Sequence, residues 1–382
     1  MKIPCTFKNL MAALLLTIAS TAVASPGIWN NAEEALIKER IEGMDLPVEA
    51  VYNSQVRDMV RRYITYGYRD AEQMLGRSGR FFPIFEHYLK INQMPESLKF
   101  LPMVESSLKP GVSSPVGAAG LWQLMSGTAT ELGLHISTYV DERLDANLST
   151  AAALSYLQEL HQRFGNWELA LAAYNCGPGN VRKAIRLGGS NDYWKIQHLL
   201  PKETQNYIPR YIAASYVAQY FAEHKLEPEM QSYDMQFTRT TRVYSGISFK
   251  KLASITGASI QTIKELNPGY IRSYIPTNSK GYFLTLPEMA MRALTDSQRW
   301  SNGEQIQTDL PMLMSVMNPD GKTPKFPITV VVRPGQTLAQ IAYDYQVTKE
   351  EIREWNKLGP KAEVYFQQSL LVYLDKRPGS GV

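Results

Sequence analysis

The chain has 382 residues, of which 40 are Lys or Arg and 36 are Asp or Glu, and hydrophobic residues make up 44% of it. This length exceeds what one compact core usually holds, so we expect two or three domains. The composition is that of an ordinary globular protein. The formal net charge of +4 is too small to favour nucleic acid as a partner.

The first 24 residues differ in composition from the rest. Lys2 and Lys8 precede an apolar run over residues 10–18, and small residues follow it just before Ser25. This order predicts a secretory signal peptide over residues 1–24. The apolar run is short for a membrane span, and an uncleaved anchor is the alternative. We therefore expect an exported, soluble periplasmic protein, with peripheral association with the outer membrane as the second possibility.

The cysteines and histidines indicate neither a disulfide nor a metal site. Cys5 precedes the apolar run, so lipid acylation there is not expected, and loss of the leader would leave Cys176 alone. No basic residue lies near Cys176 in sequence, so we expect it to fill space rather than to act as a nucleophile. The five histidines are scattered and lack the spacing of metal ligands. The sequence predicts no metal and no cofactor.

The region over residues 25–93 has the periodicity of helices. Apolar residues recur every three or four positions, first over residues 37–41 and then over 56–64. Arginines accompany the second run, as a solvated face or as a contact for anionic glycan or lipid. The aromatic residues at 81–85 are expected to lead into a short helix that ends near Leu89 and packs under the next one.

A single carboxylate stands on the apolar face of that next helix. Leu98, Leu101 and Leu108 share one face of a helical wheel, and Glu105 falls on the same stripe. Burial raises the pKa of a carboxyl, which can then act as a general acid near neutral pH. Small residues over 110–120 would let a ligand approach the backbone. We expect one wall of a cleft here, although a carboxylate that only pairs with an arginine or caps backbone N–H groups would show the same pattern.

Further helices are predicted beyond this wall from apolar spacing and capping residues. Two glycines that flank a proline predict a sharp turn at 175–179. Together these elements predict an all-helical domain over residues 94–223. The helices expected are one capped by Ser126 or Thr128 and ended by Gly133, one from Ser149 to Gly165, one from Trp167 to Tyr174, and one from Glu203 to Phe221.

Three motifs follow one another in this helical region. They are Glu105-Ser106-Ser107 with Ser114-Pro115 and Gln123-Leu124-Met125, then Ala173-Tyr174-Asn175-x-Gly177-x-Gly179, then Glu203-Thr204-x-x-Tyr207-x-Pro209. The ordered set resembles the signature of the SLT-type lytic transglycosylases of bacterial cell walls. The resemblance implies a mainly α, lysozyme-like catalytic domain that acts on peptidoglycan.

The resemblance also implies a mechanism with one acid. Glu105 would protonate the oxygen of the β-1,4 bond between N-acetylmuramic acid and N-acetylglucosamine and then take a proton from the sugar's own 6-hydroxyl, which closes a 1,6-anhydro ring. Most glycosidases use a second carboxylate. Asp141, Glu142 and Asp145 are the nearest acids after the wall and are the alternatives for that role.

Other motif residues are expected to hold the sugar. Core packing is the alternative for Met125 and Tyr174, and Trp122 is expected to be a core anchor rather than a sugar platform. The substrate-binding residues that the resemblance implies are Ser114, Gln123, Met125, Tyr174, Asn175 and Tyr207, the last of them near Glu105.

An internal repeat follows the helical region. Residues 246–267 align without gaps on residues 335–356, at a constant offset of 89 residues. Each copy predicts a small α+β module with the order strand, helix, helix, strand. The copies are expected at 242–287 and 328–375, and a linker over 288–327 is expected to begin as a short helix.

The second copy resembles LysM, a domain that binds peptidoglycan and chitin, through Gly335-Gln336-Thr337-Leu338 and Trp355-Asn356. Gln336 stands where LysM commonly has Asp, which leaves the sugar affinity open. The first copy is more degenerate, so a spacer that has kept the fold and lost the ligand is the alternative there.

These expectations describe an exported peptidoglycan lytic transglycosylase, a monomer whose partners are glycan strands of the cell wall. Two alternatives belong to other classes. A hydrolase of the goose-lysozyme type would use the same fold and leave reducing ends. A non-catalytic wall-binding protein would keep the modules alone, and the intact Glu105, Gln123 and Tyr174 argue against it.

Overall fold

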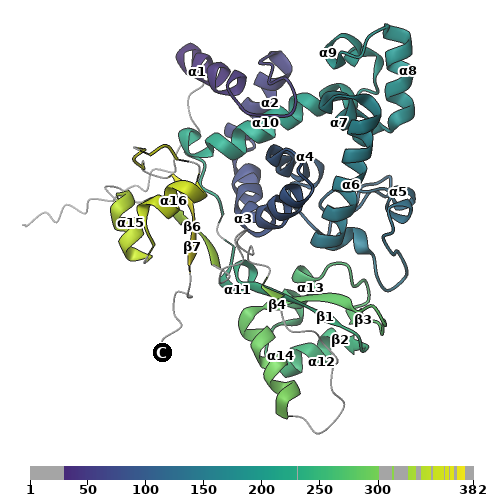
Figure 1. Ribbon diagram of the computed structural model, residues 1–382, viewed down its shortest axis with the longest axis vertical. Helices are drawn as coiled ribbons and strands as arrows, with labels where there is room; N and C mark the ends of the chain where they lie inside the picture. The colour runs from purple at the N-terminus through teal and green to yellow at the C-terminus, as the bar shows by residue number, and fades with distance from the viewer. Residues whose placement is uncertain are drawn as a thin grey trace, which may run out of the picture.

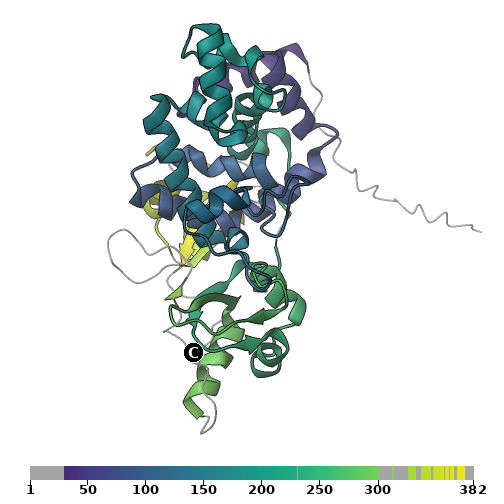
Figure 2. The same ribbon diagram turned by 90° about the vertical axis from the view of Figure 1, so that its right-hand side faces the viewer.

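The computed structural model describes residues 30–229, 231–300, 312–313, 326–332, 337–345, 347–356, 358–360, 362–364 and 368–374. Figure 1 shows a helical body with a strand-containing module beneath it, and the side view in Figure 2 shows the same stacking. The named strands all follow residue 237. The architecture is therefore mainly α with small α+β modules, as predicted. The predicted signal peptide, Cys5 and most of the linker lie outside the described residues.

The first two helices form where the sequence predicts them. They are α1 (Asn31–Glu42) and α2 (Ser54–Ile64). Asn30 and Asn53 cap them, because each asparagine side chain accepts a backbone N–H three residues further on. The apolar stripe of these helices is buried, at Ile37, Ile41, Val56, Val60 and Ile64.

The third helix differs from the prediction. A single helix of 24 residues, α3 (Tyr68–Ile91), runs through Pro83, so the expected short helix beginning after the aromatic cluster is wrong. Proline removes one helical hydrogen bond, but the helix buries its aromatic face here. Phe85 is fully buried and meets Trp122 edge to face at 5.3 Å between ring centroids. The aromatic cluster therefore packs against the wall at Trp122 and, through Phe82, against Phe100 just before the helix of Glu105, with 5.7 Å between the ring centroids of Phe82 and Phe100.

Glu105 lies on a short helix that follows a 3-10 turn. The turn is η1 (Glu96–Phe100) and the helix is α4 (Leu101–Ser106), with Pro102 in its first turn. Leu108 is fully buried, but Ser107 and Leu108 have φ of 51° and 60°. The helix therefore ends before Leu108. The predicted burial of the apolar residues is therefore confirmed, but the prediction that they lie on one continuous helix is wrong.

Two capping predictions are wrong. No side chain caps α5, which begins at Ser126 itself, and α6 begins three residues before Ser149. Asp145 caps α6 by accepting the backbone N–H groups of Asn147 and Leu148. A carboxylate placed earlier competes successfully for these N–H groups.

The remaining helices of the body surround α6. The predicted helices near Trp167 and Glu203 are confirmed, while the helix over 178–188 was not predicted. The elements are α5 (Ser126–Glu131), η2 (Glu142–Leu144), α6 (Ala146–Phe164), α7 (Trp167–Cys176), α8 (Pro178–Gly188), α9 (Tyr193–Ile196), η3 (Gln197–Leu199), η4 (Thr204–Asn206), α10 (Tyr207–Tyr220), η5 (Phe221–His224) and α11 (Tyr233–Gln236).

The predicted repeat is confirmed. In each copy the first and last strands pair antiparallel, with Thr238 opposite Pro287 in the first copy and Phe326 opposite Leu374 in the second. The first copy and its following helix comprise β1 (Thr238–Val243), β2 (Ile247–Ser248), α12 (Phe249–Thr256), α13 (Ile260–Leu266), β3 (Tyr274–Ile275), β4 (Tyr282–Pro287) and α14 (Glu288–Trp300), and β5 (Met312–Leu313) pairs with β1. The second copy comprises β6 (Phe326–Val331), α15 (Leu338–Asp344), α16 (Lys349–Trp355) and β7 (Ser369–Leu374).

One asparagine closes each copy. Asn267 donates to the Thr285 carbonyl at 2.6 Å and accepts the Thr285 N–H at 2.7 Å. Asn356, 89 residues later, makes the same two bonds with Leu371, both at 2.7 Å. Each amide thus ties the end of the second helix to the last strand, which explains why the repeat retains this residue.

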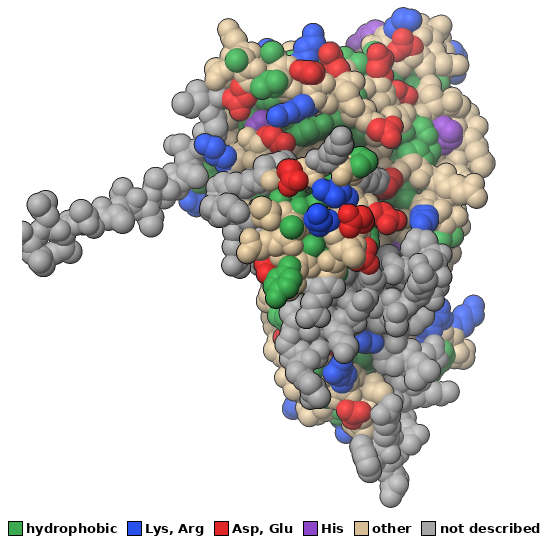
Figure 3. All heavy atoms as spheres, turned by 60° about the vertical axis from the view of Figure 1, so that its left-hand side comes forward, with side chains coloured by type: hydrophobic (Ala, Val, Ile, Leu, Met, Phe, Trp, Pro, Cys, Tyr) green, Lys and Arg blue, Asp and Glu red, His purple; other side chains and the backbone are tan. Residues whose placement is uncertain are grey.

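Two observations concern the hydropathy and the charge of the described residues. Among the described residues, no helix combines the length and hydropathy needed to cross a membrane. On the face drawn in Figure 3, basic and acidic side chains are intermixed where the residues are coloured.

Candidate active site

The candidate acid sits where two helices meet. Glu105, in the last turn of α4, is half-buried, and the fully buried Tyr207 at the start of α10 donates its hydroxyl hydrogen to Glu105 Oε1. The contact joins the first and the third sequence motifs. The predicted proximity of these two residues is thus confirmed.

The pKa of Glu105 is raised to about 7. Burial is the main cause, because it penalises the charged form, and the nearby charge of Glu203 adds to it. The hydrogen bond from Tyr207 and the positive charge of Arg210 act in the opposite direction. Glu105 therefore carries a proton in a large fraction of molecules near neutral pH, as a general acid requires.

A second tyrosine, Tyr174, lies close enough to Glu105 for the charge of the carboxylate to affect its pKa. The Tyr174 hydroxyl, on α7, donates to the Trp122 carbonyl at 2.7 Å. Burial and the charge of Glu105 raise the pKa of both Tyr174 and Tyr207 well above that of a free phenol. Both side chains therefore remain protonated, and available as hydrogen-bond donors, near neutral pH. The structure brings Glu105, Tyr174 and Tyr207 together.

The loop of the cleft wall, residues 110–125, is stabilised by hydrogen bonds among its own polar groups. Ser114 Oγ accepts the Ala118 N–H at 3.0 Å, and Gln123 Nε2 donates to the Gly120 carbonyl at 2.9 Å. Gln123 has a φ of +47°, a rare backbone conformation that turns the chain sharply. Met125 closes the loop with 45% of its surface exposed. This exposure argues against the alternative of core packing for Met125.

The second and third motifs are also joined. Thr204 Oγ1 donates to Asn175 Oδ1 at 2.6 Å, and Thr204 is fully buried. Burial raises the pKa of the neighbouring Cys176 thiol, so this residue lacks the thiolate of a nucleophile. Among the described residues, no group of three His, Cys, Asp or Glu side chains could hold a metal ion.

The three alternative acids have structural partners. Asp141 pairs with Arg143 at 2.7 Å, Asp145 caps α6, and Glu142 Oε2 accepts the N–H of His135 at 2.7 Å. Trp122 is fully buried in the core, where its Nε1 donates to a threonine, as expected of a core anchor.

Sequence reasoning missed two charged neighbours of Glu105. In the sequence, Glu203 stands only as part of the third motif and as the start of a helix, and Arg210 belongs to none of the motifs. Arg210 lies three residues after Tyr207 on α10 and therefore shares its helical face. That spacing is the pattern that could have identified it.

Comparisons with known families agree with this architecture. Residues 82–197 match the transglycosylase SLT domain, residues 237–301 match the LysM-like domain of lytic transglycosylase MltD, and residues 330–372 match the LysM domain.

Individual relatives are cell-wall enzymes by name. Membrane-bound lytic murein transglycosylase D of Escherichia coli K12 is 32% identical over 275 residues, which are 71% of this chain and 58% of that protein. Soluble lytic murein transglycosylase of the same strain is 31% identical over 189 residues, 47% of this chain and 27% of that protein. A crystal structure of the 70 kDa soluble lytic transglycosylase of Escherichia coli is 29% identical, with a TM-score of 0.34, over 46% of this chain and 30% of that one.

The chain thus spans less than two thirds of the length of each of these relatives. Its motif order, its helical body and its repeated modules agree with the three family matches. The chain therefore contains a transglycosylase SLT domain at residues 82–197 with LysM-type domains after it, and over these domains it is similar to lytic murein transglycosylases.

Proposed function

We propose that this chain cleaves the β-1,4 bond between N-acetylmuramic acid and N-acetylglucosamine in peptidoglycan and leaves a 1,6-anhydromuramic acid end. The observation that carries the proposal is the state of Glu105. It is a half-buried carboxyl with a pKa of about 7 that receives the hydroxyl hydrogen of Tyr207. Such a group can give up a proton and take one back within a single turnover.

The reaction proceeds in two proton transfers. Glu105 gives its proton to the glycosidic oxygen as the bond from C1 to that oxygen breaks. The carboxylate then removes the proton from the 6-hydroxyl of the same sugar, and O6 bonds to C1. Glu105 ends protonated again, and water is not consumed. The substrate N-acetyl group stabilises the positive charge at C1, so the protein needs no second carboxylate.

We propose roles for the other motif residues on the same basis. Gln123 uses its nitrogen within the loop, which leaves its amide oxygen to accept the N–H of an N-acetyl group. Ser114 contacts the sugar near the scissile bond, and Met125 lines the subsite of the reacting sugar. Tyr174 and Asn175 form the floor.

We also propose that the second LysM copy, over residues 328–375, holds glycan near the cleft. The first copy, over residues 242–287, is the weaker candidate for glycan binding. The protein would be a monomer exported to the periplasm, where it meets its polymeric substrate. Peripheral contact with the outer membrane fits this placement.

One observation favours a second candidate function. The charge of Glu203 acts on Glu105, and an exposed second carboxylate could direct a water molecule, as in an inverting or retaining hydrolase. The product would then carry a reducing end instead of an anhydro ring. A Glu203→Gln variant that lost all cutting would support the hydrolase.

Mass spectrometry of muropeptides released from purified sacculi tests both candidates. We expect anhydro products from the wild-type chain, none from Glu105→Gln, and unchanged sedimentation of that variant with sacculi. Hydrated products would establish the hydrolase. Release of glycan by Glu105→Gln would contradict the assignment of the acid.

A further inference from the structure

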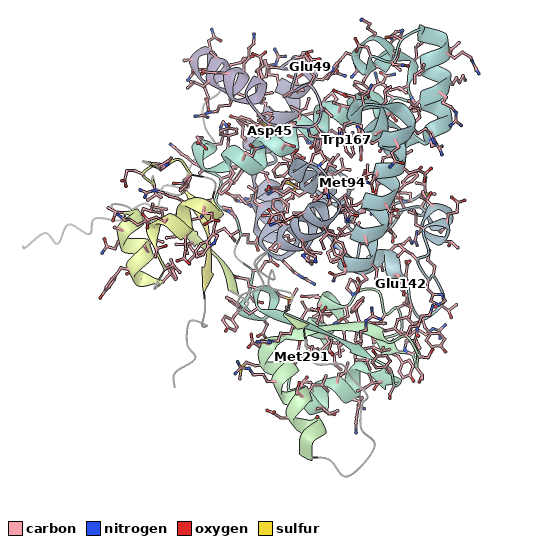
Figure 4. The ribbon with its side chains drawn as sticks, viewed as in Figure 1. Asp45, Glu49, Met94, Glu142, Trp167 and Met291 are labelled. Atoms are coloured by element: carbon pink, nitrogen blue, oxygen red, sulfur yellow. The ribbon has the colours of Figure 1, made fainter. Side chains whose placement is uncertain are left out.

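The first LysM-like module, defined here as residues 238–300, is joined to the helical body through main-chain hydrogen bonds. The Asp141 N–H donates to the Gly269 carbonyl at 2.9 Å, and the Ile271 N–H donates to the Tyr139 carbonyl at 3.0 Å. Figure 4 shows Glu142, the neighbour of Asp141, at the lower end of α6 on the side of this module. The module therefore contacts a segment that belongs to the body.

That segment carries a buried ion pair. Asp141 Oδ1 accepts from Arg143 Nε at 3.0 Å, and Asp141 Oδ2 accepts from Arg143 Nη2 at 2.7 Å. Both residues are buried, at 8% and 9% exposure. Such a two-bond fork fixes the plane of the guanidinium, and the remaining N–H groups must find acceptors inside the protein.

Those acceptors belong to the cleft wall. Arg143 Nη1 donates to the carbonyls of Gly117 at 2.7 Å and of Leu124 at 3.1 Å. The Arg143 carbonyl lies so close to Gly120 that a Cβ there would stand 1.9 Å from it. The wall between these contacts includes Gln123, so a single arginine holds this loop on both sides.

The wall is bonded in turn to the helix of the acid. Ser106 Oγ donates to the Leu121 carbonyl at 2.9 Å, and Ser106 follows Glu105 directly. A continuous path thus runs from the first module through Asp141 and Arg143 to the wall and then to the end of α4.

We propose that Asp141 and Arg143 are positioning residues that make the first module a fixed part of the catalytic cleft. The inference rests on the proposed transglycosylase function and deepens it. It assigns to this module a role in the rate of the chemical step, separate from holding glycan. In this proposal the wall, which is bonded to Ser106 next to Glu105, limits the access of water to that carboxyl and sets the position of Gln123.

Two variants of the full chain test the path at its two ends. Arg143→Lys keeps the charge but cannot bridge two carbonyls and a carboxylate. Gly269→Val places a side chain against the Asp141 carbonyl, because even a Cβ would stand 3.0 Å from it. Gly359→Val in the second LysM copy is the matched control, since no atom lies within 4 Å of its Cβ position.

We expect kcat for anhydro-muropeptide release to fall about 10- to 100-fold in both variants, with KM nearly unchanged, because a displaced loop misorients the sugar. We also expect the alkaline limb of the pH profile to move to lower pH, because water that enters past the loosened wall lowers the pKa of Glu105. Lower stability alone would not move that limb. The control should match the wild type.

Unchanged kcat and an unchanged pH profile in both variants would overturn the inference. If Arg143→Lys does not fold, Gly269→Val decides alone. If the wild-type chain releases no muropeptide, the proposed function fails, and hydrogen exchange of the amides at residues 117–124 decides the inference instead. Faster exchange in Gly269→Val than in Gly359→Val would support the path, and equal exchange would refute it.

Discussion

The Tyr207 hydroxyl and the Glu105 carboxyl are hydrogen-bonded although they lie 102 positions apart in the sequence. Burial alone would raise the pKa of this carboxyl further than the value of about 7 that it has, because the bond from Tyr207 lowers it. The strength of the acid is thus set jointly by α4 and α10, and a change on α10 can tune it without touching Glu105.

Tyr207→Phe removes this hydrogen bond, so the pKa of Glu105 should rise above about 7. We expect a lower kcat and an alkaline limb of kcat/KM that lies at higher pH than in the wild type. Tyr211→Phe, the same change one turn further along α10 at another buried tyrosine, is the control and should leave the limb in place. If the alkaline limb of kcat/KM in Tyr207→Phe lies at the same pH as in the wild type or at lower pH, the assigned hydrogen bond is contradicted.

Glu105→Gln should change the pH dependence of stability. The folded-state pKa of about 7 exceeds the ordinary 4.5, so the folded protein holds this proton more tightly than the unfolded chain does. The wild type therefore loses stability as pH rises from 4.5 through 7. We expect the variant to exceed the wild type by about 1 to 3 kcal/mol at pH 8 and to match it near pH 4. Thermal unfolding at the two pH values is the measurement, and an equal difference at both would show that no such shift exists.

Asp145→Asn separates capping from catalysis. Asparagine caps helices as well as aspartate does, and burial raises the pKa of Asp145 from 3.8 to about 6. As for Glu105, the folded protein binds this proton more tightly than the unfolded chain does, so the wild type loses stability as pH rises. We expect the variant to be more stable than the wild type by about 1 to 2 kcal/mol above pH 7, with the difference gone near pH 4. Muropeptide release should be unchanged, and a large loss of it would restore Asp145 as a second catalytic acid.

Asn267→Ala and Asn356→Ala should each loosen one module. The change leaves the N–H and carbonyl of the facing strand residue without their side-chain partner. We expect a loss of about 2 to 4 kcal/mol in the affected module, seen as faster hydrogen exchange at the amide of Thr285 or Leu371. Asn180→Ala, at an exposed asparagine with one local hydrogen bond, is the control. If these amides exchange at the same rate as in the control, the asparagine does not clamp the second helix to the last strand.

Much of the fold follows from local pattern. Ile37 and Ile41 recur at helical spacing and are buried, and the repeat with an 89-residue offset does form two copies of one module. These predictions succeeded because the relevant contacts lie within one element or one short unit. The place of Glu105 on an apolar stripe predicts its burial and therefore its raised pKa, whereas its role as the acid is predicted from the ordered motifs.

The wrong or missing predictions concern sites where two interactions compete and contacts between residues far apart in the sequence. Pro83 predicts an interrupted helix locally, but the buried aromatic face of α3 outweighs one lost hydrogen bond. Ser149 is a good cap by type, yet Asp145 reaches the N–H groups first. The bonds from Arg143 to Gly117 and Leu124 join residues 26 and 19 positions apart, and no periodicity reports such pairs.

The asparagine clamp limits how these modules can be cut and moved between proteins. Because a single amide ties the second helix to the last strand, a fragment that stops before Thr285 or before Leu371 lacks the partner that completes the unit. A transplanted copy must therefore carry its own final strand. Because the partners of the amide are main-chain atoms, a chimaera joined between α13 and β3 keeps this clamp as long as an asparagine remains at the end of the second helix.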